Sequence, residues 1–184
     1  NAVDNVSLVI PDGQVLAITG HSGSGKSTLL NLISGLDQPT SGDIKVLNMH
    51  YKYLNQHQIA KFRSEKIGFI FQNYNLLAKT TAVENVELPL MYNKTYNAHQ
   101  RREAAIKALQ AVGLGDRLEH KSNQMSGGQM QRVAIARALV NNPAVILADE
   151  ATRNLNTRTK FEILCPIQVL HRQGRTTHLV THNP

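Results

Sequence analysis

The sequence has almost no cysteine and no long apolar run, and both absences exclude classes of protein. No stretch approaches the roughly eighteen apolar residues that a membrane helix needs, so the sequence predicts no membrane-spanning helix. Cys165 is the single cysteine and lies in an apolar run, so the chain can form neither an internal disulfide nor a cysteine-based metal site. A buried thiol in a reducing, cytosolic compartment is the natural interpretation.

The composition describes an ordinary globular chain with a positive charge. Its 184 residues, 41% of them hydrophobic, are enough for one domain with a sizeable core. The formal net charge of +7 suits nucleic acid, anionic lipid or a polyanionic ligand such as a nucleotide. Basic residues are spread along the chain instead of forming a tail, so charge alone selects none of these partners.

Strand-like and helix-like segments alternate along the chain. Short apolar runs bounded by polar or turn residues predict buried parallel strands at 14–20, 66–72, 143–150 and 176–182. A helical stretch follows the first run and continues through Leu36. Strands separated by helices predict an α/β fold with a mostly parallel sheet.

Residues 73–142 form a long, largely helical insertion between two predicted strands. The sequences "TAVE" (81–84) and "NAHQ" (97–100) have the spacing of capping boxes, so each predicts the start of a helix. The polar stretch 113–124 is predicted to be a connecting loop.

The first functional motif is "GHSGSGKST", which matches G-x-x-x-x-G-K-[ST] between a predicted strand and a predicted helix. Its glycines let backbone N–H groups converge on phosphate oxygens at a helix N-terminus. Lys26 is expected to reach the β- and γ-phosphates, and the Ser27 hydroxyl to bind Mg²⁺. The predicted nucleotide-binding residues are Gly20, His21, Ser22, Gly23, Ser24, Gly25, Lys26, Ser27 and Thr28.

A pair of carboxylates ends the apolar run "AVILADE". Open α/β sheets bind their ligands at the carboxyl ends of the strands. Two adjacent side chains point to different sides, so Asp149 is expected to hold Mg²⁺ and Glu150 to act as general base toward water. A solvated strand exit is the alternative, which the nearby phosphate loop makes less favourable.

A second anion-binding helix start is predicted at "SGGQ". Ser126 and Gln129 have capping-box spacing, so a helix is expected from Ser126 to about Asn141. Gly127 and Gly128 leave its N-terminus uncovered. One phosphate loop already surrounds most of a nucleotide, so this helix start would best serve a nucleotide held by another copy. A glycine-rich cap without a ligand is the alternative.

Together these motifs resemble the nucleotide-binding domain of ABC transporters along essentially the whole chain. "GHSGSGKST" looks like the Walker A loop, "SGGQMQR" like the signature motif and "VILADE" like the Walker B strand. Gln72 is similar to the Q-loop glutamine and His182 to the switch histidine. The segment "IGFIFQNYNLLAKTTAVENVELPL" most resembles the lipoprotein-release and macrolide-export branch.

The resemblance implies a single P-loop NTPase domain over 1–184, with a RecA-like core at about 1–72 and 143–184 and a helical subdomain at about 73–142. Two copies would pack head to tail around two ATP molecules and hydrolyse them with Mg²⁺. Each ATP would meet Walker A of one copy and Ser126, Gly127, Gly128, Gln129 and Asn156 of the other. Glu150, His182 and Gln72 would be catalytic, and Ser27, Gln72 and Asp149 would hold the metal.

The same resemblance implies a membrane partner. The domain would work at the cytoplasmic face of the cell membrane as a peripheral subunit on a transmembrane permease, with no nucleic acid expected. The segment "QNYNLLAKT" (72–80) is the expected contact, with Tyr74, Leu76 and Leu77 either exposed there or packed in the core.

Several positions depart from the family pattern. Ala151 stands where a proline is usual, Arg153 where a small residue is usual, and Asn156 where the family has an aspartate. Slow ATP hydrolysis is therefore expected. Pro166 falls in a helix-like run and predicts a kink or break. Against the family, the sequence looks truncated at both ends.

Two other functions remain open from the sequence. An ABC-type ATPase acting on nucleic acid would suit the charge, although there is no heptad run, cysteine cluster or second Walker A motif. A regulatory module that binds ATP with little hydrolysis would suit the altered stretch 151–156, although Glu150 argues against it.

Overall fold

A parallel sheet forms the centre of the protein in the computed structural model, which describes residues 3–149 and 176–180. Its strands are β1 (Val15–Ile18), β4 (Ile67–Ile70), β5 (Val145–Asp149) and β6 (Thr176–Val180), in the order β1-β6-β5-β4. The described part of each strand lies within its predicted range. The α/β fold class predicted from the sequence is therefore confirmed.

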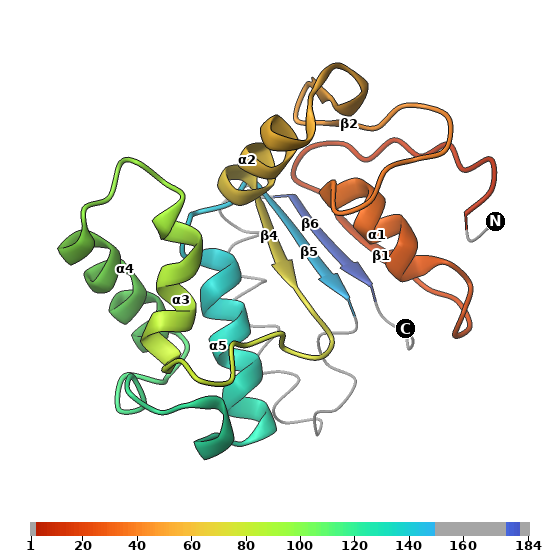
Figure 1. Ribbon diagram of the computed structural model, residues 1–184. Coiled ribbons are helices and arrows are strands. Elements are labelled where there is room, and N and C mark those ends of the chain that lie inside the picture. The colour runs from red at the N-terminus through yellow and green to blue at the C-terminus, as the bar shows by residue number, and fades with distance from the viewer. Residues whose placement is uncertain (1–2, 150–175, 181–184) are drawn as a thin grey trace.

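The carboxyl ends of the strands meet at one edge of the sheet. In β6, Val180 pairs in register with Ile18 on one side and with Asp149 on the other. Ile70 of β4 pairs with Ala148 of β5. The arrowheads of β4, β5 and β6 point to the same edge in Figure 1. Segments that follow these strands are consequently brought together.

Helices cover both faces of the sheet because β4 and β5 bury apolar side chains on both sides. Side chains alternate between the two faces along β5. On one face pack α1 (Lys26–Ser34) and α2 (Gln56–Lys66), and on the other packs α5 (Gly127–Leu139). The first apolar cluster comprises Leu30, Val46, Tyr51, Ile59, Ile67, Val145 and Leu147, and the second comprises Ile70, Ile135, Ala138, Ile146 and Ala148.

Gly68 explains how closely α5 approaches β4. A Cβ atom added at Gly68 would lie 2.5 Å from the backbone oxygen of Ala138 and 2.9 Å from Cγ of Pro143. Any larger residue would therefore push the helix away from the sheet.

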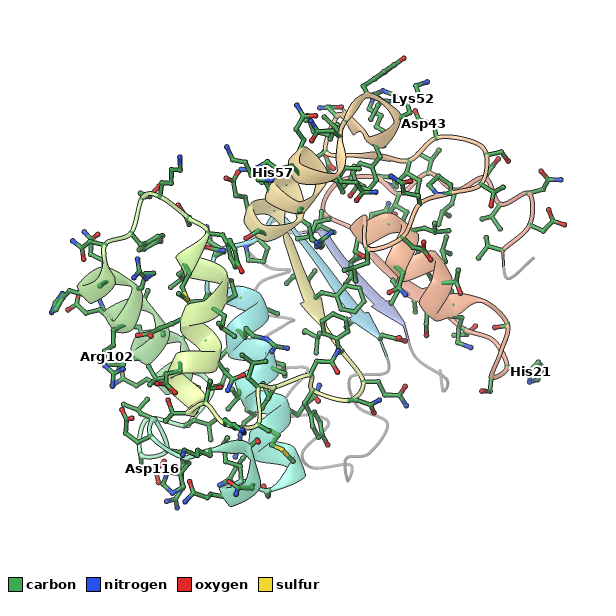
Figure 2. All side chains as sticks on the ribbon, viewed as in Figure 1. His21, Asp43, Lys52, His57, Arg102 and Asp116 are labelled. Carbon is green, nitrogen blue, oxygen red and sulfur yellow. The ribbon has the colours of Figure 1, made fainter. Side chains whose placement is uncertain are left out.

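The segment between α1 and β4 holds elements that the sequence analysis did not predict. A short hairpin joins β2 (Lys45–Val46) to β3 (Met49–His50), and a 3₁₀ turn, η1 (Tyr51–Tyr53), follows. The α2 helix begins with a capping box between Asn55 and Gln58. Asp43 and Lys52 lie together beside the hairpin (Figure 2), with 3.5 Å between Oδ2 and Nζ.

Three helices fill the insertion between β4 and β5, as predicted. They are α3 (Ala82–Met91), α4 (Ala98–Ala111) and α5, with a 3₁₀ turn, η2 (Ser122–Gln124), before α5. All three predicted capping boxes are present. The helices share an apolar cluster of Ala82, Val83, Val86, Ala105, Leu109, Leu114, Met125, Val133 and Ala136.

The α5 helix contributes to this cluster and also to the sheet face, so it lies between the two (Figure 1). Across residues 3–149 and 176–180, no helix has the length and apolarity required to span a bilayer. The predicted division of the chain into two subdomains at residues 72 and 143 stays a prediction.

Candidate functional site

The phosphate loop lies between β1 and α1, as its motif predicts. Gly25 is the N-cap of α1 with a φ of 88°, and Gly23 has a φ of 80°, so both adopt the left-handed conformation that favours glycine. No side chain caps α1. The start of the helix is therefore open to an anion, which its unpaired N–H groups and dipole favour.

The loop side chains are mostly exposed. His21, Ser22, Ser24 and Ser27 are exposed, and Thr28 is partly buried. His21 lies at the outer tip of the loop with its ring directed away from the fold (Figure 2). The backbone of the loop and the hydroxyl of Ser27 are thus accessible to a ligand, while His21 contacts no catalytic group among the described residues.

Lys26 is the buried charge of this loop, with only 7% of its surface exposed. Its Nζ donates hydrogen bonds to the backbone oxygens of Gly20 and His21, both at 2.7 Å, and to Oγ of Ser24 at 3.2 Å. The ammonium is held inside the loop by uncharged acceptors. A phosphate oxygen would supply the negative charge that these acceptors lack.

Asp149 ends β5 at the same edge of the sheet. Its Oδ1 is buried, and none of the described residues donates a hydrogen bond to it. A carboxylate oxygen can only accept, so a buried one needs a donor or a cation. A divalent cation bound to this oxygen would provide the partner that it lacks.

The described residues contain no cluster of three or more histidine, cysteine or acidic side chains that could hold a metal alone. A cation at Asp149 would therefore need ligands from elsewhere, such as the Ser27 hydroxyl and the oxygens of a phosphate. Mg²⁺ is usually held by a few protein ligands together with oxygens of the substrate.

Gln72 lies two residues beyond β4 and is partly buried. Because Ile70 pairs with Ala148, Gln72 emerges beside the end of β5 that carries Asp149. The sheet therefore brings the ends of β1, β4 and β5 to one edge, which carries three of the predicted functional segments.

The second predicted anion site starts α5. Oγ of Ser126 accepts the Gln129 N–H at 3.3 Å, and Oε1 of Gln129 accepts the Ser126 N–H at 2.8 Å. The Gln129 side chain thus caps the start of its own helix. Ser126 is exposed and Gly127 and Gly128 are partly exposed, so the helix start faces solvent.

The two anion sites are on opposite sides of the sheet. The α1 helix packs on one face and α5 on the other, with β4, β5 and β6 visible between them (Figure 1). One chain therefore does not bring the Ser126 surface onto its own phosphate loop. The predicted residues Glu150, Asn156 and His182, and the departures at 151, 153 and 166, lie outside the described residues.

The predicted contact segment 72–80 is partly buried. Leu76 packs against the helical cluster, and Tyr74 is partly buried. Leu77 is 49% exposed and Lys79 is exposed. Of the two alternatives for the apolar residues, Leu76 follows the core alternative and Leu77 the exposed one.

Sequence reasoning missed two polar residues that hold this segment. Buried Asn85 bonds to residues 77–81, and Arg137 bonds to residues 74 and 75. A signal existed for Asn85, which is a polar residue among the apolar positions of α3. The sequence contains no signal for the role of Arg137, because its partners are 62 and 63 residues away.

Known proteins are similar to this chain in sequence and in fold. The profile of the family described as ABC transporter matches residues 3–153. An uncharacterized ABC transporter ATP-binding protein of Thermotoga maritima is 50% identical over 99% of this chain and 77% of its own length. The macrolide export ATP-binding/permease protein MacB of Hyphomonas neptunium is 49% identical over 99% of this chain and 28% of its own length.

A solved structure matches as well. It is the dimeric structure of a post-hydrolysis state of the ATP-binding cassette MJ0796, bound to ADP and Pi, and the protein of that name comes from Methanocaldococcus jannaschii. The TM-score is 0.93 at 45% identity, and the match covers 99% of this chain and 80% of that one.

Proposed function

This chain belongs to the ABC transporter family as an ATP-binding domain, and on that premise we propose that two copies close head to tail around two MgATP and hydrolyse them. The observation that carries this proposal is the separation of the two anion sites on opposite sides of one sheet. A second copy, turned by half a revolution, would bring its Ser126 surface to the first copy's phosphate loop. The dimeric cassette bound to ADP and Pi supports the arrangement.

Within one copy, the phosphate loop binds the triphosphate. Lys26 exchanges its bonds to the carbonyls of Gly20 and His21 for oxygens of the β- and γ-phosphates. N–H groups of residues 20–28 and the open start of α1 contribute further hydrogen bonds. Bound Mg²⁺, held by Ser27, Asp149 and Gln72, would neutralise charge on the phosphates.

The partner subunit completes the site. Ser126, Gly127 and Gly128 of the partner subunit present an uncovered helix start to the γ-phosphate, with Gln129 of the partner subunit bracing that helix start. Glu150 accepts a proton from the attacking water as it adds to the γ-phosphorus and ADP leaves. His182 holds the γ-phosphate and the water. These roles follow from the family pattern and the motif positions.

The dimer is tested with the Glu150→Gln protein, in which loss of the base should let bound ATP persist. Sizing by light scattering with and without MgATP should show a monomer converting to a dimer. Glu103→Gln, which changes an exposed carboxylate on α4, is the matched control and should stay monomeric at the same MgATP concentration. A Glu150→Gln protein that binds ATP yet remains monomeric at high concentration contradicts the sandwich.

We further propose that hydrolysis is slow because of Asn156. Asparagine keeps the size of the family's aspartate but has no charge and offers an amide where a carboxylate would accept. One lost positioning contact typically costs about 10²-fold in rate. Asn156→Asp should raise the turnover of ATP with little change in its affinity. Equal turnover in the two proteins would show the asparagine to be tolerated.

The same domain would dock on a membrane permease through residues 72–80 and so work at the cytoplasmic face of the membrane. Leu77 and Lys79 are exposed in this segment, which follows Gln72 directly. A photo-cross-linker attached at Lys79→Cys should reach the permease, and the same label at Lys107→Cys, exposed on α4, should not. Cross-linking from Lys107→Cys but not from Lys79→Cys would show that the docking site is not at residues 72–80.

A further inference from the structure

One arginine joins the two segments that would face the nucleotides. Arg137 is on α5, and its guanidinium donates from Nη1 to the backbone oxygen of Asn75 at 2.6 Å and from Nη2 to that of Tyr74 at 2.8 Å. The partners are 62 and 63 residues away in the sequence. In Figure 1, the segment that leaves β4 crosses α5 before it reaches α3. The planar fork of the guanidinium holds two successive carbonyls at once.

The clamped residues have a backbone conformation that side chains disfavour. Tyr74 has a φ of 60° and Asn75 a φ of 47°, both in the left-handed region. Such residues persist only where the surroundings hold them. A 3.2 Å bond from the Tyr74 N–H to the Phe71 oxygen closes the turn, and Arg137 holds the other side. The arginine thus selects the path that the chain takes immediately after Gln72.

The clamp is partly buried: the bond to Tyr74 is half-covered, and the bond to Asn75 lies at the surface. Burial lowers the pKa of the Arg137 guanidinium from its ordinary value, and among the described residues no carboxylate forms an ion pair with it. A partly desolvated cation that is held by two carbonyl dipoles loses hydrogen bonds if those dipoles move. The guanidinium and the 74–75 backbone are therefore expected to move as one body.

Tyr74 extends this contact to the start of α5. Its hydroxyl oxygen lies 3.1 Å from the position that a Cβ atom on Gly127 would occupy. Tyr74, two residues after Gln72, therefore meets α5 at two places: its carbonyl at Arg137 and its hydroxyl beside Gly127. Any displacement of Gln72 has a short, packed route to the Ser126–Gly128 surface.

We propose that Arg137 is a positioning residue that fixes the Gln72 segment to α5, so that a nucleotide in a chain's own phosphate loop orients the helix start which that chain presents to its partner. This inference rests on the proposed function, which assigns Gln72 and the Ser126–Gly128 surface to nucleotides. What it adds is the residue through which the two segments of one chain are joined, Arg137.

Hydrogen exchange on dilute, monomeric protein tests the coupling without a partner. MgATP should slow amide exchange in peptides covering 70–77 and also in peptides covering 124–132, by about fivefold or more in each. Arg137→Lys keeps the positive charge but cannot bond two carbonyls at once. In this variant, MgATP should slow amide exchange only in peptides covering 70–77. The variant should still bind MgATP, because the phosphate loop is untouched, and exchange is compared at saturating MgATP.

Arg101→Lys is the matched control. Arg101 also donates to a backbone oxygen, that of Tyr96 at 3.2 Å, but within the helical insertion and away from residues 72–75. Both peptides should respond to MgATP in this variant as in the parent. Tyr74→Ala is a second variant, which leaves the clamped carbonyls in place and should weaken the response at 124–132 even if Arg137→Lys does not fold.

The outcomes separate the inference from the proposed function. A response of residues 124–132 in Arg137→Lys equal to the parent's overturns the inference, as does a parent that binds MgATP with no change at 124–132. A parent that fails to bind MgATP overturns the proposed function and the inference with it.

Discussion

Buried polar side chains in this protein differ in how fully their hydrogen-bonding capacity is used. Asn85 is completely buried and uses both ends of its amide: Oδ1 accepts the Leu77 N–H at 2.8 Å, and Nδ2 donates to Oγ1 of Thr80 at 2.7 Å and to the Thr81 oxygen at 2.9 Å. Asp149 is the opposite case, with an oxygen that none of the described residues satisfies. The first pattern holds a loop in place, and the second marks a position where a ligand is needed.

Replacing Asn85 should be costly. Asn85→Ala leaves the Leu77 N–H without its acceptor at a fully buried position, while the Thr81 oxygen keeps the backbone N–H of residue 85, so we expect a loss of about 2–3 kcal/mol in the free energy of unfolding. Asn97→Ala, which removes the exposed cap of α4, should cost about 1 kcal/mol. Urea unfolding compares the two variants. Equal losses would mean that solvent reaches the Asn85 site.

Tyr51 provides a pH-dependent test. Its hydroxyl donates to the Ile33 oxygen at 2.8 Å, and burial raises its pKa to about 12, above the ordinary value of about 10. The unfolded chain loses this proton first, so the contribution to stability is complete below about pH 10 and falls as the pH rises toward 12.

An alkaline titration followed by tyrosinate absorbance should show one ionisation step near pH 12 in the parent. Tyr51→Phe should remove that step and leave the rest of the curve unchanged. A Tyr51→Phe curve that retains the late step would assign it to another tyrosine.

At the scale of single elements, what was predictable from the sequence was local. The capping boxes at Thr81, Asn97 and Ser126 each depend on two residues three positions apart, and all three are present. Strands β4 and β5 were predictable because both faces are apolar. The phosphate loop was predictable because its spacing and its flanking elements are parts of one motif.

What was missed depends on distant partners or on a weak pattern. The α2 helix buries only Ile59 completely, so it has no apolar periodicity to detect, although its capping box was available in the sequence. The contacts of Arg137 with residues 74 and 75 cannot be read from any window of the sequence, because the fold alone brings these segments together.

The contact between β4 and α5 yields a prediction at the element scale. Gly68→Ala should destabilise the protein by about 1–3 kcal/mol, because the new methyl group would meet the backbone of Ala138, which cannot move without shifting α5. Gly115→Ala is the control, since the closest approach of a Cβ atom there is to the flexible side chain of Gln110, at 3.1 Å, and the backbone of Gln110 is at 4.0 Å, an ordinary contact. Thermal unfolding measures both, and similar midpoints would show that α5 yields easily.

At the scale of the whole molecule, the loop that binds the nucleotide begins a helix of the core. Lys26 ends the loop and starts α1, whose Leu30 belongs to the apolar cluster on the sheet. A ligand that orders the loop should therefore stabilise the entire fold by linkage, by about 2.7 kcal/mol at a hundredfold excess over Kd.

We expect MgATP to raise the melting temperature of the parent and to leave that of Lys26→Met unchanged, because the buried ammonium is the main charge offered to the phosphates. Lys61→Met, at an exposed position on α2, should retain the full shift. Scanning calorimetry with and without MgATP distinguishes the variants. An equal shift in Lys26→Met would mean that nucleotide binds elsewhere.

The order of the strands also determines when β1 can pair during synthesis. Among the described strands, β1 pairs only with β6, which the ribosome makes roughly 160 residues later. At about 5–20 residues per second, β1 waits on the order of ten seconds or more with its backbone unpaired. Local contacts can assemble α3, α4 and α5 meanwhile, but the phosphate loop, which follows β1, has no finished sheet to carry it. The nucleotide can therefore contribute to folding only after β6 has been made, and chaperones can act during the interval between β1 and β6.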